Sequence, residues 1–291
     1  MLGGQPTKIE SGNIDRIEKC KSLILTRQQS SEHPYHKGEL GRFHIFEIKR
    51  ENKQIVFFGS KHVSDPDDEM FRMIETKFQE MKPDLVLIEG VDLANNEDGK
   101  AKLREELSEA DRSDVIRKGG EPLFTLKLAM DSGIDFESPT KPLGEEIKYL
   151  LKSGFSRRDT FIYYISRSVY GYQRENTNGN IDDCRLHLER YVRRFLRESG
   201  WDQFELRSYA DEFLSDLDLS DDRYKRAVNP GLARGRTITN EIADQSSNFR
   251  NRSILERIAE GLEKHNKLFI VYGSGHAVVL EPALRELMAQ F

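Results

Sequence analysis

The chain has 291 residues, of which 37% are hydrophobic and 33% charged, so it can bury a substantial core and is not disordered in composition. Its 45 basic and 50 acidic residues give a net charge of −5, which argues against a nucleic-acid partner held by phosphate neutralisation. With two cysteines, no signal-peptide pattern and no stretch near the roughly 20 apolar residues of a membrane span, we expect a cytoplasmic protein without a membrane partner.

The N-terminal residues are polar and rich in types that interrupt regular structure, so we expect an N-terminal arm at 1–40 with at most one short helix. From Phe43 the pattern changes to short apolar runs. We predict three strands, at residues 43–48, 54–58 and 84–90. A helix over about 64–81 separates the second strand from the third, so these elements form a strand–helix–strand unit.

The middle of the chain is charged and has the periodicity of helices. Its apolar spacing, interrupted by Gly and Pro, predicts helices at about 100–117, 122–131, 143–152, 157–172, 182–198 and 202–215. A short strand is expected at 134–137. The aspartates at 216–222 are expected to form a solvated loop, because the Gly and Glu of a calcium-binding loop are missing. The chain then ends with a helix, a strand and a helix, at about 237–264, 268–272 and 278–290.

One segment occurs twice, near the two ends of the chain. Residues 52–62 and 266–276 both begin with Asn-Lys, continue with an apolar run, and end with Gly-Ser-x-His. Each copy predicts a buried strand that ends at a glycine, with a histidine about one turn later. Open α/β sheets build their sites at the carboxyl ends of the strands, so we expect His62 and His276 to form one composite site.

The predicted fold class is α/β, with a central mixed sheet of pseudo-two-fold βαβ halves that is flanked by helices. The two copies lie too far apart in sequence for a solenoid, and they fit a pseudo-symmetric sheet with a helical insertion in the middle. We place this insertion at about 100–236, inside a single domain that spans 41–291.

Two further side chains, both carboxylates, are candidates for the same edge of the sheet. Two imidazoles and a carboxylate form a usual hydrolytic metal set with an open position for water. Glu89 closes a buried strand, so we expect it to act as a metal ligand or as a general base. Glu137 reaches the same edge if residues 134–136 form a strand. Considered by themselves, Arg250 and Asn251 are predicted to be part of a solvated helix face.

Two Gly-x-x-His motifs at opposite ends, an acidic residue that closes a core strand, and Arg-Asn ahead of the second motif resemble the TraB/TIKI family. That family belongs to a wider superfamily with the erythromycin esterases and the ChaN-like haem-binding proteins. The resemblance covers about residues 43–291 and implies an α/β core with pseudo-two-fold halves. By motif, the family's site positions fall on His62, Glu89, Glu137, Arg250, Asn251 and His276.

The resemblance implies a metal-dependent peptidase supported by manganese or cobalt, so we expect a hydrolase of the metalloprotease type that acts on a peptide or amide bond. The divalent ion (Mn, Co or Zn) is expected to be held by four side chains, those of His62, Glu89, Glu137 and His276. Arg250 is expected to stabilise the oxyanion, and Asn251 to orient a ligand or the substrate.

Two alternatives remain open at this stage. One is a non-catalytic protein that binds or sequesters a peptide or small molecule, as in some TraB-like proteins. The other is a metal-independent esterase of the erythromycin esterase type, in which a histidine activates water. The sequence leaves open the substrate, the metal and the oligomeric state, with a homodimer among the options.

Overall fold

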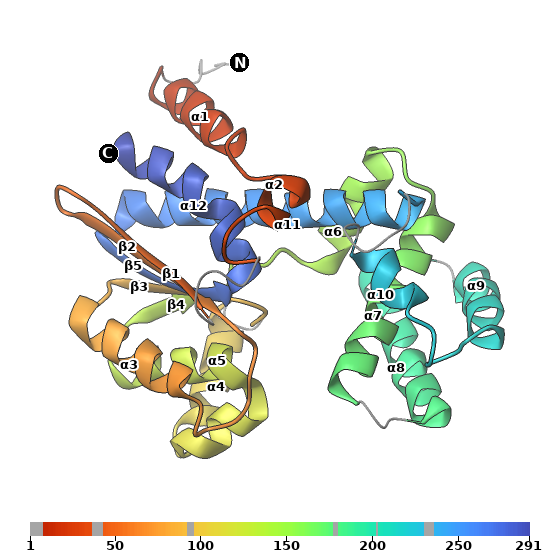
Figure 1. Cartoon of the computed structure of the whole chain (residues 1–291). Coiled ribbons are helices and arrows are strands. Elements are labelled where there is room, and N and C mark those ends of the chain that lie inside the picture. The colour runs from red at the N-terminus through yellow and green to blue at the C-terminus, as the bar shows by residue number, and fades with distance from the viewer. Residues whose placement is uncertain (1–7, 37–42, 92–95, 177–179, 202, 230–235) are drawn as a thin grey trace, which may run out of the picture. The chain divides into compact units, whose positions relative to one another are not determined.

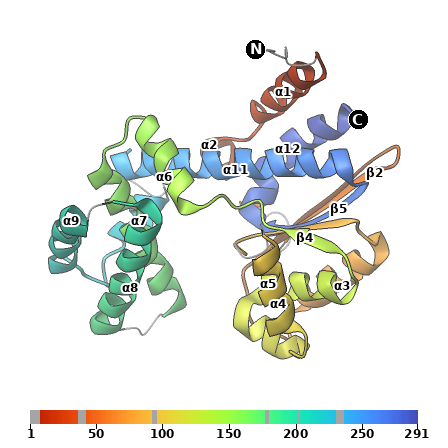
Figure 2. The same ribbon diagram turned by 180° about the vertical axis from the view of Figure 1, so that it is seen from behind.

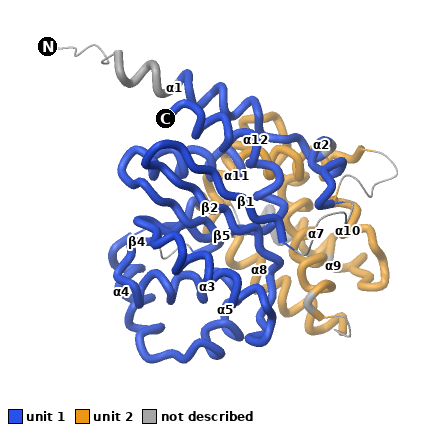
Figure 3. Tube along the Cα trace, turned by 60° about the vertical axis from the view of Figure 1, so that its left-hand side comes forward, with its two compact units in different colours: residues 1–140, 251–291 blue, residues 141–250 orange. Residues whose placement is uncertain are grey.

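The computed structural model describes residues 8–36, 43–91, 96–176, 180–201, 203–229 and 236–291. The chain divides into two compact units, of which unit 1 comprises Met1–Thr140 and Asn251–Phe291, and unit 2 comprises Lys141–Arg250 (Figure 3). Both ends of the chain therefore belong to the same unit. Residues 100–140, which we assigned to the insertion, fold with the sheet. None of the helices described is long and apolar enough to cross a membrane.

Unit 1 contains a mixed sheet with the strand order β1-β2-β5-β3-β4 (Figure 1). Its five strands are β1 (His44–Arg50), β2 (Lys53–Ser60), β3 (Leu85–Ile88), β4 (Asp135–Glu137) and β5 (Lys267–Gly273). β1 pairs antiparallel with β2, and the other neighbours pair in parallel. The predicted α/β fold with a central mixed sheet is confirmed. β5 lies between β2 and β3, so the two copies of the repeated segment are adjacent strands.

Helices cover both faces of this sheet. One face is covered by α3 (Glu69–Met81), α4 (Glu97–Leu107) and α5 (Arg112–Asp131), which lie together in the view from behind (Figure 2). The other face is covered by α12 (Ser274–Ala289) and by the unit 1 part of α11 (Ile238–Lys264). Successive strand residues point to opposite faces, so Val56 and Phe58 enter the first core while Ile55 and Phe57 enter the second.

The N-terminal arm holds two helices, α1 (Lys8–Lys21) and α2 (Arg27–Ser31), so the expectation of at most one short helix is wrong. The sequence of α1 is polar, but Ile17 and Cys20 pack into the core beside α12. Tertiary packing of a narrow apolar face thus stabilises a helix that composition disfavours. Residues 1–7 and 37–40 of the predicted arm lie outside the described residues.

The described residues of unit 2 form helices joined by loops, with no strand among them. Its helices are α6 (Leu143–Lys152), α7 (Arg157–Glu175), α8 (Ile181–Ser199), α9 (Gln203–Ser215), α10 (Arg223–Val228) and the first part of α11. Aromatic residues of α7 and α8 build its core, with Phe161, Tyr163 and Phe195 fully buried. The sequence predicted every one of these helices except α10.

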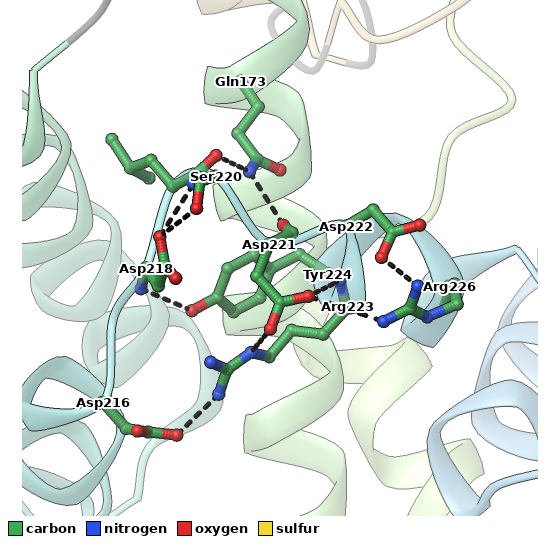
Figure 4. Close-up of polar contacts among 10 residues, drawn as sticks. Gln173, Asp216, Asp218, Ser220, Asp221, Asp222, Arg223, Tyr224 and Arg226 are labelled. Carbon is green, nitrogen blue, oxygen red and sulfur yellow. Dashed lines mark hydrogen bonds and ion pairs between the residues drawn. The ribbon is translucent and has the colours of Figure 1, made fainter.

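The acidic loop between α9 and α10 is bound by arginines (Figure 4). Arg223 pairs with Asp216 at 2.5 Å and with Asp221 at 2.6 Å. The amide of Gln173, on α7, donates to the loop carbonyls of Leu219 and Asp221. The backbone and side chain of Arg223 hold the pKa of Asp221 below its usual value. The predicted loop is therefore present, and arginines of α10 pair with three of its four aspartates, Asp216, Asp221 and Asp222.

The first half of each repeated copy performs the same structural task. Lys53, at the start of β2, donates from Nζ to the carbonyl oxygens of Leu262 (2.6 Å) and His265 (2.9 Å), at the end of α11. Lys267, at the start of β5, donates from Nζ to the carbonyl of Met81 (3.2 Å), at the end of α3. Each lysine thus caps the C-terminus of the helix that leads into the next strand of the sheet, where a positive charge is stabilising.

Candidate functional site

The second halves of the two copies meet at the carboxyl edge of the sheet. Ser60 Oγ donates to the carbonyl of Tyr272 on β5 at 3.2 Å, and Ser274 Oγ donates to the carbonyl of Gly59 on β2 at 2.9 Å. Each serine therefore ties the end of its own copy to the other copy. These two hydrogen bonds fix the ends of the two strands, from which the two histidines extend.

Three of the predicted residues come together at this edge. His62 lies two residues past β2, Glu89 directly follows β3, and His276 is in the first turn of α12. His62 Nε2 is 3.9 Å from Glu89 Oε2, and His276 Nε2 is 3.7 Å from Glu89 Oε1. The two imidazoles thus face different oxygens of one carboxylate, although they come from opposite ends of the chain.

Glu89 is anchored at the beginning of α12. The backbone N–H of Gly273 donates to Glu89 Oε2 at 2.7 Å, and Gly273 is the N-cap residue of that helix. The N-terminus of a helix carries partial positive charge, so a carboxylate is favoured there. A Cβ on Gly273 would lie 3.0 Å from His62 Nε2 and 3.4 Å from Glu89 Oε2. The repeated glycine therefore leaves room for both side chains.

The other nitrogen of each imidazole is held by an oxygen atom. His62 Nδ1 is 2.6 Å from Glu121 Oε1, and His276 Nδ1 is 2.6 Å from Asn251 Oδ1. Asn251 is 3% exposed, and so it lies inside the unit and not on a solvated helix face. The residue that we expected to orient a ligand or the substrate thus contacts one of the two site histidines.

Glu121 is a residue of this site that the sequence did not reveal. It is 2% exposed, and Ser60 Oγ donates to its Oε1 at 2.8 Å. The local signal is the run Gly-Gly-Glu-Pro at 119–122, which predicts a break in a helix. Nothing in that run points to a histidine that precedes it by 59 residues.

The structure does not bring Glu137 into this group. Glu137 does end a strand, as expected, and it lies opposite Leu87 of β3. Its Oε2, however, is 2.5 Å from the guanidinium of Arg257 on α11. The ion pair explains a carboxylate at this position without a metal, and the role of Glu137 as a fourth metal ligand stays a prediction that this contact does not support.

Arg250 is the last residue of unit 2, and Asn251 the first residue of the returning part of unit 1. Arg250 Nε lies 3.5 Å from the carbonyl of Ser246, one turn earlier in α11.

The donor chemistry at the edge fits a divalent ion. Two imidazoles and one glutamate are the ligands of several catalytic zinc sites, and ligating histidines usually bond a carboxylate or carbonyl through their second nitrogen. Two ligands of one tetrahedral ion lie about 3.4 Å apart, and the distances from the imidazoles to Glu89 are slightly longer. Among the residues described, no group of three or more His, Cys, Asp or Glu is arranged to hold a metal ion as it stands.

No family model matches this chain, and no match is found among curated proteins or solved structures. The resemblance to the TraB/TIKI family therefore depends on the motifs alone. The fold and the geometry of the site are what bear on function.

Proposed function

We propose that this protein is a metal-dependent hydrolase of the TraB/TIKI type that acts on a peptide or amide bond. The observation that supports the proposal is the position of two imidazole nitrogens, from opposite ends of the chain, 3.9 and 3.7 Å from the two oxygens of Glu89. A divalent ion bound there supplies Lewis-acid chemistry, since it lowers the pKa of a water ligand and polarises a carbonyl oxygen.

The residues of the chain take distinct parts in this reaction. His62 and His276 hold the ion through Nε2. Glu89, kept in place by the N-terminus of α12, would complete the ligand set or accept a proton from the attacking water. The side chain of His62 is 51% exposed, which gives water and substrate access to this edge. Arg250 remains our prediction for stabilising the oxyanion.

We also propose that the protein acts in the cytoplasm. Cys20 and Cys184 are both buried free thiols. Reduced, unpaired cysteines are typical of a reducing compartment.

Metal binding is tested by the thermal stability of the purified full-length chain. Mn²⁺, Co²⁺ or Zn²⁺ is expected to raise the unfolding midpoint, because an ion that binds only the folded state stabilises it by about 2.7 kcal/mol at 100 times its Kd. His62→Ala and His276→Ala are expected to lose this effect. His265→Ala is the matched control, since His265 lies at the opposite edge of the sheet beside Lys53. A wild-type chain that none of the three ions stabilises would contradict the metal site.

Hydrolysis is tested with a panel of quenched peptides and simple amides in the presence of each ion. Glu89→Gln keeps the shape of the side chain but cannot accept a proton, so the rate is expected to fall about 10²- to 10⁴-fold. His62→Ala is expected to remove nearly all turnover while the far-UV circular dichroism is unchanged. Unchanged activity in either variant would overturn the assignment.

The same geometry supports a second candidate, a metal-independent esterase. A histidine whose Nδ1 is fixed by an acceptor and whose Nε2 faces the reacting side is also the arrangement of a general base. Ester hydrolysis that persists under strong chelation would favour this candidate. Stabilisation by peptides without turnover of any substrate would instead favour a binding protein.

A further inference from the structure

His62 is the more exposed of the two histidines at the site. Its side chain is 51% exposed against 16% for His276, and it follows β2 outside any helix or strand. A half-exposed side chain of this kind has several accessible rotamers unless a contact selects one. One such contact is with Glu121, whose Oε1 lies 2.6 Å from His62 Nδ1.

We propose that Glu121 is a positioning residue that fixes both the orientation and the tautomer of His62, so that the proton is on Nδ1 and Nε2 faces Glu89. Asn251 does the same for His276. The role of this arrangement in catalysis rests on the proposed function. The tautomers themselves are a property of the folded chain and are measured without a substrate.

The hydrogen-bonding chemistry of Glu121 and Asn251 supports this assignment. An amide oxygen only accepts, and an ionised carboxylate such as that of Glu121, which also accepts from Ser60 Oγ at 2.8 Å, only accepts as well. The short contacts to these oxygens therefore require N–H on Nδ1 of each imidazole. A neutral imidazole carries one proton, so Nε2 then presents its lone pair toward Glu89.

The backbone around Glu121 is shaped to bring its carboxylate to His62. α5 is broken at Gly119 and Gly120, and Gly120 has φ +59° and ψ −148°, a conformation that is essentially confined to glycine. A Cβ on Gly120 would lie 2.8 Å from the carbonyl of Val63, the residue after His62. The break thus lets the backbone of α5 approach the segment that carries the histidine.

Burial of Glu121 is consistent with a specific role and not with a solvated charge. A buried carboxylate is costly unless hydrogen bonds compensate for the lost water. Here the compensating donors are Ser60 and His62, both at the end of β2. The fold therefore keeps a buried acid at a point where its contacts are the repeated serine and the repeated histidine of one copy.

The tautomers are tested by long-range ¹H–¹⁵N correlation NMR of the full-length protein with ¹⁵N-labelled histidine at pH 8, where ordinary histidines are neutral. His62 and His276 are each assigned from the signals that disappear in the corresponding alanine variant. Both are expected to show the Nδ1–H pattern, whereas Nε2–H dominates in histidine free in water. An Nε2–H pattern for wild-type His62 would overturn the proposal without any further variant.

Two variants then distinguish the effect of Glu121 on His62 from the effect of Asn251 on His276. Glu121→Ala is expected to release His62 from the Nδ1–H form and to leave His276 unchanged, and Asn251→Ala is expected to do the reverse. Glu121→Gln, which retains an acceptor oxygen like that of Asn251, is expected to keep His62 as Nδ1–H. General loss of structure would change both histidines together, so it cannot imitate this exchange. A Glu121→Ala protein in which His62 remains Nδ1–H would contradict the role of Glu121.

Activity provides a separate readout where turnover is observed. Glu121→Ala is expected to lower kcat/KM about 10- to 100-fold, as is usual when a residue that orients a metal-binding histidine is lost, and Glu121→Gln is expected to retain most of the activity. The fall is expected in kcat more than in KM, because a positioning residue does not contact the substrate. If the wild-type chain hydrolyses nothing, the proposed function fails while the NMR result still decides the role of Glu121.

Discussion

The two copies of the repeated segment are alike at one edge of the sheet and different at the other. At the amino edge, Asn52 donates to Asn266, and the two following lysines cap two different helices in the same way. At the carboxyl edge the copies separate. The first continues into an irregular segment with an exposed histidine, and the second enters α12 within one residue.

This difference shows that one local pattern serves two purposes. The Asn-Lys-strand part determines how each copy joins its neighbours, and it does so whether the strand leads into an irregular segment or into a helix. The histidines share a motif position, yet a buried carboxylate holds His62 and a buried amide holds His276. Equivalent positions in sequence therefore do not imply equivalent chemistry.

The glycines should give the largest difference between the copies. A Cβ on Gly59 would lie 2.4 Å from the carbonyl of His44 and 2.8 Å from the Cβ of Ala277, so backbone must move. Gly59→Ala is expected to destabilise unit 1 by about 3 kcal/mol, at the upper end of overpacking effects. Gly273→Ala meets only side chains of the site, so it is expected to cost less than about 1 kcal/mol and to disturb His62 instead.

Chemical denaturation followed by circular dichroism measures the stability part, and metal stabilisation measures the effect on the site. Gly275→Ala is the matched control, because a Cβ there meets no atom within 4 Å and alanine favours a helix. Equal stability of the Gly59 and Gly273 variants would show that the two glycines are interchangeable, contrary to the comparison.

The serines should give an intermediate effect. Ser60→Ala removes the hydroxyl whose one proton lies between buried Glu121 Oε1 and the carbonyl of Tyr272, and because the carboxylate is buried a loss of about 2 kcal/mol is expected. Ser274→Ala removes a donor only from backbone carbonyls of β2, and about 1 kcal/mol is expected. The same denaturation experiment compares them, and a larger loss from Ser274→Ala would reverse the predicted order.

The lysines should give the smallest difference, because they perform the same task. Lys53→Met keeps the aliphatic stem but removes bonds to two carbonyls, and about 1 kcal/mol is expected from the loss of a partly buried helix cap. Lys267→Met removes one longer bond and is expected to cost about half as much. Neither variant is expected to change metal stabilisation. A loss of that stabilisation in either lysine variant would mean that the two edges of the sheet are coupled.

Much of the fold could be predicted because its signals are local. Continuous apolar runs placed β2, β3 and β5 within two residues, and apolar periodicity placed α6 to α9. The errors occur where a short-range signal was weak or was overridden. The predicted helix over 100–117 is two helices, since Asp111 accepts from the backbone of Asp114 and begins a new one. The short α10 was missed, and α1 is stabilised by packing on α12.

The site was predicted only in part, and the reason is the range of the contacts. His62, Glu89 and His276 each stand at the end of a strand pattern, so the carboxyl-edge rule was enough to group them. Glu137 satisfied the same rule, but Arg257 of α11 pairs with it, and that partner is 120 residues away (257 − 137). Glu121 follows a broken helix and satisfied no rule at all.

The sequence by itself determined the strands, most of the helices, and the two histidines with a carboxylate at their edge, because spacing and burial patterns act over a few residues. Only the tertiary structure decided that β5 lies between β2 and β3 and so brings the two copies side by side. It also decided which acidic residue contacts which basic residue: Glu121 contacts His62, and Glu137 pairs with Arg257. Such pairings depend on which helix packs over which strand end, and no short-range pattern encodes that choice.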